Sequence, residues 1–157
     1  MVCCCKLYLT GINKMNQLSK KERHTYHKQL LASAIEFSYR YERYKTDFSI
    51  AMGHSPAKID LEPMSNFIRH TDRFIVLNDN TCAILLDCAN DESGIKAANN
   101  LLTKFLGGAF EITLYSVVVT ASNYSSSEIM IRELFYLMDF AIANNTNQQV
   151  IDRSQII

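Results

Sequence analysis

The residues of this sequence that could do chemistry gather between Arg69 and Cys88, in the stretch RHTDRFIVLNDNTCAILLDC. Two apolar runs, RFIVL and TCAILLD, flank the polar trio Asn78-Asp79-Asn80, which predicts a β-hairpin with a tight turn. A turn presented on a sheet is a suitable place for catalytic groups, but this one carries a single carboxylate. Metal-assisted phosphoryl transfer needs several hard oxygen ligands, so the turn by itself does not predict an active site.

Cysteine and histidine chemistry is a second class to consider. Cys82 and Cys88 fall on or beside a predicted strand, and no C-x-x-C pair is joined to histidines at zinc spacing. A Cys–His hydrolase needs an electropositive setting for its thiol, and no motif around either cysteine supplies one. His24 and His27 lie on the polar side of a predicted helix, and His54 falls in a predicted turn. A cysteine-dependent enzyme therefore ranks last.

Length and composition indicate one globular domain. The chain has 157 residues, and 16 basic residues balance 16 acidic ones, which argues against a general binder of nucleic acid or membrane surfaces. No apolar run approaches the roughly 18 residues that a membrane-spanning helix needs, and the start lacks the pattern of a signal peptide. Three of the five cysteines are contiguous at 3–5, so a disulfide scaffold is not predicted, and a reducing cytoplasm is the expected compartment.

We predict a flexible tail over residues 1–17 and one domain over 18–157. The domain begins with a long helix over 19–45, because five apolar side chains recur at helical spacing: Leu30, Ala34, Phe37, Tyr41 and Tyr44. Residues 20–23 make the first turns polar, so we expect that part of the helix to project from the body.

Strands and helices then alternate along the chain. We predict a strand over 47–53, a brief helix over 59–70 with Leu61, Met64, Phe67 and Ile68 inward, and then the hairpin. A helix capped by Asn90 or Asp91 should end at Gly107, and a long strand should follow over 109–121. A last helix over 126–144, with Ser125 and Glu128 in a capping-box relation, leads to a short closing strand. This order predicts a layered α/β sandwich.

Taken together, these segments resemble the GGDEF domain of bacterial diguanylate cyclases over roughly residues 30–152. YRYERYKTDFSIAM resembles the lead-in to the family's first strand, and RHTDRFIV resembles the stretch ahead of its signature hairpin. CAILLDCANDESGIKAANNLL resembles the strand and helix that follow, and SVVVTASNYSSSEIMIRELFYLMDFAIANNTNQQVI the closing strand, helix and turn. The resemblance implies an α/β (α+β) sandwich with a central, mostly antiparallel sheet flanked by helices.

The five-residue signature of the family falls on Asn78, Asp79, Asn80, Thr81 and Cys82, and none of the five matches it. In the family, two glycines let the backbone approach the nucleotide, and two acids bind metal and support catalysis. The family's metal aspartate falls near Gly53 or His54, and the guanine-binding segment after it is much shorter here. The resemblance therefore implies a domain with no diguanylate cyclase activity, no cofactor and no catalytic metal.

One family feature does match. Its product-inhibition site is R-x-x-D placed five residues before the signature, and Arg69 and Asp72 have that form and that gap. The resemblance implies that Arg69 reads guanine O6 and N7 or a phosphate of cyclic di-GMP, and that Asp72 accepts from guanine N–H groups. Arg73 and Lys104 are candidates for a second contact to phosphate. The same pair could instead be structural, with Asp72 as a cap and Arg69 as its ion-pair partner.

Two functions remain open. The first is a cyclic di-GMP receptor, and the alternative is a ligand-free dimerisation or protein-docking module in bacterial signalling. The long amphipathic first helix is the feature that favours the alternative, with a homodimer through that helix as one form of it. The balanced charge predicts no nucleic-acid partner.

Overall fold

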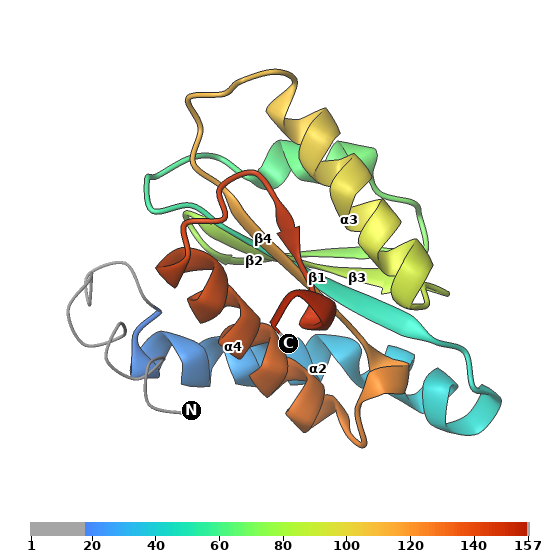
Figure 1. Cartoon of the computed structure of the whole chain (residues 1–157). Coiled ribbons are helices and arrows are strands. Elements are labelled where there is room, and N and C mark those ends of the chain that lie inside the picture. Colours follow the sequence, from blue (N-terminus) through green and yellow to red (C-terminus); the bar gives the residue numbers. More distant parts are fainter. Residues whose placement is uncertain (1–17, 157) are drawn as a thin grey trace.

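Five strands form one sheet at the centre of the molecule, in the order β2-β3-β1-β4-β5 (Figure 1). The computed structural model describes residues 18–156, so the predicted tail lies outside the described residues. The strands are β1 (Phe48–His54), β2 (Arg73–Asn78), β3 (Thr81–Asp87), β4 (Tyr115–Thr120) and β5 (Val150–Ile151). All neighbouring pairs are antiparallel except β4 and β5, which are parallel, so the prediction of a mostly antiparallel sheet is confirmed.

Helices cover both faces of this sheet. Helices α2 (Lys20–Tyr44) and α4 (Ser127–Ala143) lie on one face, and α3 (Asp91–Leu106) lies on the other with the short 3-10 helix η1 (Glu62–Phe67) (Figure 1). No helix within the described residues is both long enough and apolar enough to cross a bilayer. The α/β sandwich with a long N-terminal helix is therefore as predicted.

The central strand β1 is buried on both faces, and its side chains divide by size. Phe48, Ile50 and Met52 point toward α2 and α4, where large apolar side chains form the main core. Ser49, Ala51 and Gly53 alternate with them toward α3, and Ala51 joins the second core. The small residues let α3 approach the sheet closely, and the large ones fill the wider space under the helix pair.

The helix ends follow their sequence signals. Ser19 caps α2 in a capping box with Glu22, and Asn90 caps α3. Gly107 ends α3 in the left-handed conformation that glycine adopts readily, as predicted. In α4 the cap is Ser126, whose side chain accepts from the amide of Ile129, so the predicted Ser125 capping box was wrong by one residue.

The long strand predicted over 109–121 starts only at Tyr115. Residues ahead of it find partners in a loop instead of a neighbouring strand. The side-chain amide of Gln148 donates to the carbonyls of Ala109 and Ile112 at 3.2 and 2.7 Å, and Asn147 accepts from the amide of Leu114 at 2.8 Å. Once those backbone groups are satisfied by side chains, the segment has no need of a sheet ladder.

The first turns of α2 do not project. Arg23 forms an ion pair with Asp139 of α4, and the ring of Tyr26 lies in the main core. The polar sequence of these turns predicted a projecting end; Lys20 and Lys21 are exposed, but Asp139 of α4 supplies a partner charge for Arg23 and holds the helix against the body. In η1, Leu61 and Met64 are buried as predicted, whereas Phe67 is exposed.

The closest approach of α3 to the sheet is at Gly94, and it gives a test of the packing. A Cβ at this position would lie 2.4 Å from Oγ of Ser49 and 2.9 Å from its Cβ, so Gly94→Ala forces α3 away from β1. We expect a loss of about 1–3 kcal/mol in the free energy of unfolding, measured by denaturant titration. Asn100→Ala on the exposed side of α3 is the matched control and should change stability little.

Candidate functional site

The hairpin turn between β2 and β3 is tighter than predicted. Asn78 pairs with Thr81 as the last rung of the ladder, so only Asp79 and Asn80 form the turn. A register shift between Val76 and Asn78 precedes it, and the side chain of Asn78 accepts from the amide of Asp79 at 2.7 Å. The turn therefore lies directly at the end of the sheet, beside the end of β1.

A set of hydrogen bonds closes the space between the turn and β1. His54 is the register partner of Thr81, and its Nδ1 lies 2.8 Å from the Thr81 hydroxyl. The Asn80 side-chain amide donates to the carbonyl of Ser55 at 2.6 Å, and the Ser55 amide donates to the carbonyl of Asn80 at 2.9 Å. The sequence predicts His54 in a turn, but the structure places it in β1, where it joins this network.

Burial determines the protonation of this end of the sheet. His54 is 8% exposed, and desolvation lowers the pKa of its imidazole, which favours the neutral ring. Cys82 is buried, and burial raises the pKa of its thiol to about 12, so it is not a thiolate nucleophile. Tyr26 of α2 lies on the same side, and burial raises the pKa of its hydroxyl. These groups form a neutral, packed end of the sheet.

The residues at the turn do not suit a magnesium ion. The only carboxylate of the turn belongs to Asp79, whose side chain is 76% exposed and lies 4.0 Å from the ammonium of Lys58. Within residues 18–156, no group of three or more His, Cys, Asp and Glu side chains is placed to hold a metal ion. Magnesium prefers hard, charged oxygen ligands in octahedral geometry, and His54, Asn80 and Thr81 offer an imidazole, an amide and a hydroxyl.

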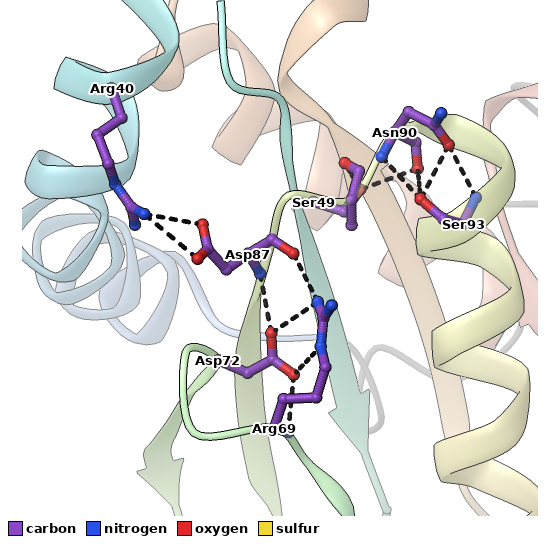
Figure 2. A network of polar contacts seen from close by, with 8 residues as sticks. Arg40, Ser49, Arg69, Asp72, Asp87, Asn90 and Ser93 are labelled. Atoms are coloured by element: carbon purple, nitrogen blue, oxygen red, sulfur yellow. Dashed lines mark hydrogen bonds and ion pairs between the residues drawn. The ribbon is translucent and has the colours of Figure 1, made fainter. Parts of the chain in front are cut away.

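Arg69 and Asp72 lie in the connection between η1 and β2, where they contact each other and the end of β3 (Figure 2). The Asp72 carboxylate accepts from the Arg69 backbone amide at 2.9 Å and from its Nε and Nη2 at 3.3 and 3.1 Å. It also accepts from the amide of Asp87 at 2.9 Å. Both oxygens of Asp72 are thus engaged, and only 3% of its side chain is exposed.

The network continues from Asp87 to helix α2. Nη2 of Arg69 donates to the Asp87 carbonyl at 2.5 Å, and the Asp87 carboxylate forms an ion pair with Arg40 at 3.1 Å (Figure 2). Cys88, the next residue, has a positive φ of 53°, so β3 ends here in a sharp turn toward α3. The hydrogen bonds that Arg69 donates to the Asp72 carboxylate raise the pKa of the Arg69 guanidinium, and 60% of the Arg69 side chain remains exposed.

The structure does not bring the two candidate sites together. His54 and Thr81 mark one end of the β1–β3 ladder, and Phe48 and Asp87 mark the other, roughly 20 Å away at the rise of a strand. Arg73 contacts α2: its guanidinium donates to the carbonyl of Ser33 at 3.0 Å and forms an ion pair with Glu36 at 3.3 Å. Lys104 lies in the last turn of α3.

Comparison with known proteins identifies the fold. No protein-family model matches the chain, and no curated protein matches its sequence. Solved structures do match: the active GGEEF domain of a diguanylate cyclase from Vibrio cholerae superimposes with a TM-score of 0.64 at 12% identity, covering 80% of this chain and 94% of that one. The GGDEF domain of DgcB from Caulobacter crescentus in complex with c-di-GMP gives a TM-score of 0.64 at 6% identity, with 80% and 89% covered.

A third structure, diguanylate cyclase SiaD in complex with its activator SiaC from Pseudomonas aeruginosa, gives a TM-score of 0.60 at 11% identity. It covers 80% of this chain and 57% of that one. Identities this low establish the fold alone. The chain has the fold of a GGDEF domain, as its segment order predicted.

The lowered pKa of the buried His54 imidazole predicts how the stability of the protein depends on pH. Its pKa in the folded protein lies below the ordinary value of 6.5, so the unfolded state binds more protons near and below that pH. Stability should therefore fall as the pH drops from 7.5 to 5. His54→Asn keeps a hydrogen-bonding group near Thr81 but does not titrate, and melting temperatures of both proteins across this range give the comparison. Parallel curves for the two proteins would contradict the assignment.

Proposed function

We propose that this chain is a catalytically inactive domain of the GGDEF type, located in the cytoplasm, that acts by binding and not by turnover. The observation that carries the proposal is the closed set of hydrogen bonds among His54, Ser55, Asn80 and Thr81. Those groups lie between the end of β1 and the hairpin turn, where the resemblance to the family expects the metal and the nucleotide.

Phosphoryl transfer gains most of its rate from metal ions and positive groups that neutralise charge on the transferring phosphoryl. At this turn the available side chains are neutral, and the one acid, Asp79, points to solvent near Lys58. A pocket of about 350 Å³ lies beside the turn, and its charged lining residues are Lys58, Asp60, Glu62 and Asp79, whereas β1 itself ends in Gly53 and His54 and carries no acid. This arrangement supports a domain that has the fold of a cyclase but lacks the catalytic groups that a cyclase needs.

The first prediction of the proposal is the absence of cyclase activity. Purified protein incubated with GTP and either magnesium or manganese should form no cyclic di-GMP above a blank without protein, measured by chromatography. A catalytic GGDEF domain assayed in parallel controls for the reagents. Steady product formation that Asn80→Ala or Thr81→Ala abolishes would overturn the proposal.

The binding event we propose is the capture of cyclic di-GMP at Arg69. Its guanidinium is 60% exposed and is held in one orientation by Asp72 and by the Asp87 carbonyl. Nε and Nη2 are engaged by these partners, so Nη1 is the nitrogen that can donate to guanine O6 or N7 or to a phosphate, at low entropic cost because the side chain is already fixed. Two of the matching structures, one of them DgcB, are described with c-di-GMP, which supports the choice of ligand.

We propose for Asp72 a different role from the one that the resemblance implied. Its two oxygens already accept four hydrogen bonds, so it positions the Arg69 guanidinium and stabilises the end of β3. A guanine would have to displace one of these donors to reach it. Contact with the ligand therefore falls to Arg69, with Asp72 as its positioning residue.

Calorimetric titration with cyclic di-GMP tests this division of roles. Arg69→Ala should weaken binding by roughly ten-fold to a hundred-fold, since a charge-assisted hydrogen bond contributes about 1.5–3 kcal/mol. Asp72→Asn should weaken binding less, but it should lower the melting temperature, because its amide presents a donor to backbone amides that need an acceptor. Arg132→Ala, an exposed arginine of α4, is the control and should change neither quantity.

The absence of heat and of any thermal shift for the wild-type protein at high micromolar cyclic di-GMP would end the receptor proposal.

The second candidate function, a ligand-free dimerisation or docking module, would then take its place. The exposed apolar side chains of Ile35 and Tyr39 on α2 favour that candidate. The complex of SiaD with its activator SiaC adds a precedent for a protein partner.

A further inference from the structure

Helix α2 carries an apolar strip on its outer side, away from the sheet. Ile35 is 65% exposed and Tyr39 is 56% exposed, and Leu31, one turn before Ile35, is partly buried because it also packs against the edge of the main core. Residues four apart lie on the same side of a helix, so the three side chains form one continuous strip. The core-facing residues of α2, among them Leu30, Ala34 and Phe37, lie on a different side. Within the described part of the chain, Ile35 and Tyr39 therefore remain exposed at the centre and one end of the strip.

Two opposite charges lie at equal distances from its centre. Lys28 precedes Ile35 by seven residues and Glu42 follows it by seven, each two turns away. Both lie within roughly 40° of Ile35 around the helix axis, as do Leu31 and Tyr39. Both charged side chains are exposed, and neither forms an ion pair among residues 18–156. We call the five residues the Ile35 face: Lys28, Leu31, Ile35, Tyr39 and Glu42.

We propose that the Ile35 face is a dimer interface, in which a second copy of this chain packs its α2 antiparallel across a two-fold axis at Ile35. Ile35 then meets the partner's Ile35, and Leu31 meets the partner's Tyr39. Lys28 pairs with the partner's Glu42 at one end, and the symmetry repeats that pair at the other end. An interface of this kind is isologous, so one patch must be complementary to itself, which this sequence of residues satisfies.

The charges select the orientation of the two helices. A parallel pair would place Lys28 against the partner's Lys28 and Glu42 against the partner's Glu42, so both ends would repel. The antiparallel pair replaces the two repulsions with two attractions and keeps the same apolar centre. Electrostatic complementarity therefore argues for a second copy in one orientation.

The size of the interface sets its strength. The Ile35 face is one strip of side chains about 21 Å long on a single helix. Such a strip covers less area than the roughly 800 Å² that each partner buries in a standard stable complex. We therefore expect a dimer whose population depends on protein concentration in the micromolar range or above. Arg40, which joins α2 to Asp87, lies on another side of the helix. The dimer thus does not depend on binding of cyclic di-GMP at Arg69, and either proposal can fail without the other.

Sedimentation equilibrium of the full chain at several concentrations tests the interface. The wild-type protein should show a monomer–dimer equilibrium, and Ile35→Arg should raise the dissociation constant at least roughly ten-fold, because it places two like charges at the axis. Phe110→Arg is the matched control: Phe110 is the most exposed large apolar residue at 84% and lies outside α2, so its change should leave the equilibrium unaltered. Circular dichroism checks that each variant is folded.

Charge exchange then tests the orientation. Lys28→Glu alone and Glu42→Lys alone should each weaken the dimer several-fold, and the double variant should restore it. A wild-type chain that stays monomeric at about 1 mM would overturn the proposal. A dimer that Ile35→Arg leaves unchanged, or one in which the double variant fails to restore the loss from the single changes, would overturn it as well.

Discussion

The structure depends on a central strand that is buried on both faces and hydrogen-bonded along both edges. β1 pairs with β3 over its whole length and with β4 over most of it, and all of its residues are buried. Such a strand must present side chains that suit two different helical layers at once. Its alternation of large residues toward α2 and α4 with small ones toward α3 meets that requirement, and it fixes how closely each layer can approach.

The ladder between β1 and β3 also explains why the two candidate sites differ in chemistry. At the hairpin end, His54 and Thr81 meet inside the sheet, where burial disfavours charge and only neutral hydrogen bonds form. At the other end, the Asp87 carboxylate forms an ion pair with Arg40, and the Asp72 carboxylate forms one with Arg69. At the charged end, the Arg69 guanidinium is held by Asp72 and the Asp87 carbonyl while its side chain still faces solvent, an arrangement that suits contact with an anionic ligand.

Helix α2 contacts several parts of the molecule because different sides of the helix have different partners. One side fills the core with Leu30 and Phe37, a second holds the end of β3 through Arg40, and a third remains apolar and exposed at Ile35. The fold is shared with GGDEF domains of solved structures at 6–12% sequence identity. The pattern of apolar residues specifies such a fold, whereas a few polar side chains specify the chemistry of the sites on it.

The sequence by itself determined the elements and their order, because helical spacing, the Asn78–Asn80 turn and the stop at Gly107 are local signals. Tertiary structure alone decided which polar groups meet. Asp72 finds the amide of Asp87 fifteen residues away, and Arg23 finds Asp139 on another helix. Segment 109–114 is irregular because loop side chains satisfy its backbone. Such partners are set by how distant segments pack, and no local pattern encodes that packing.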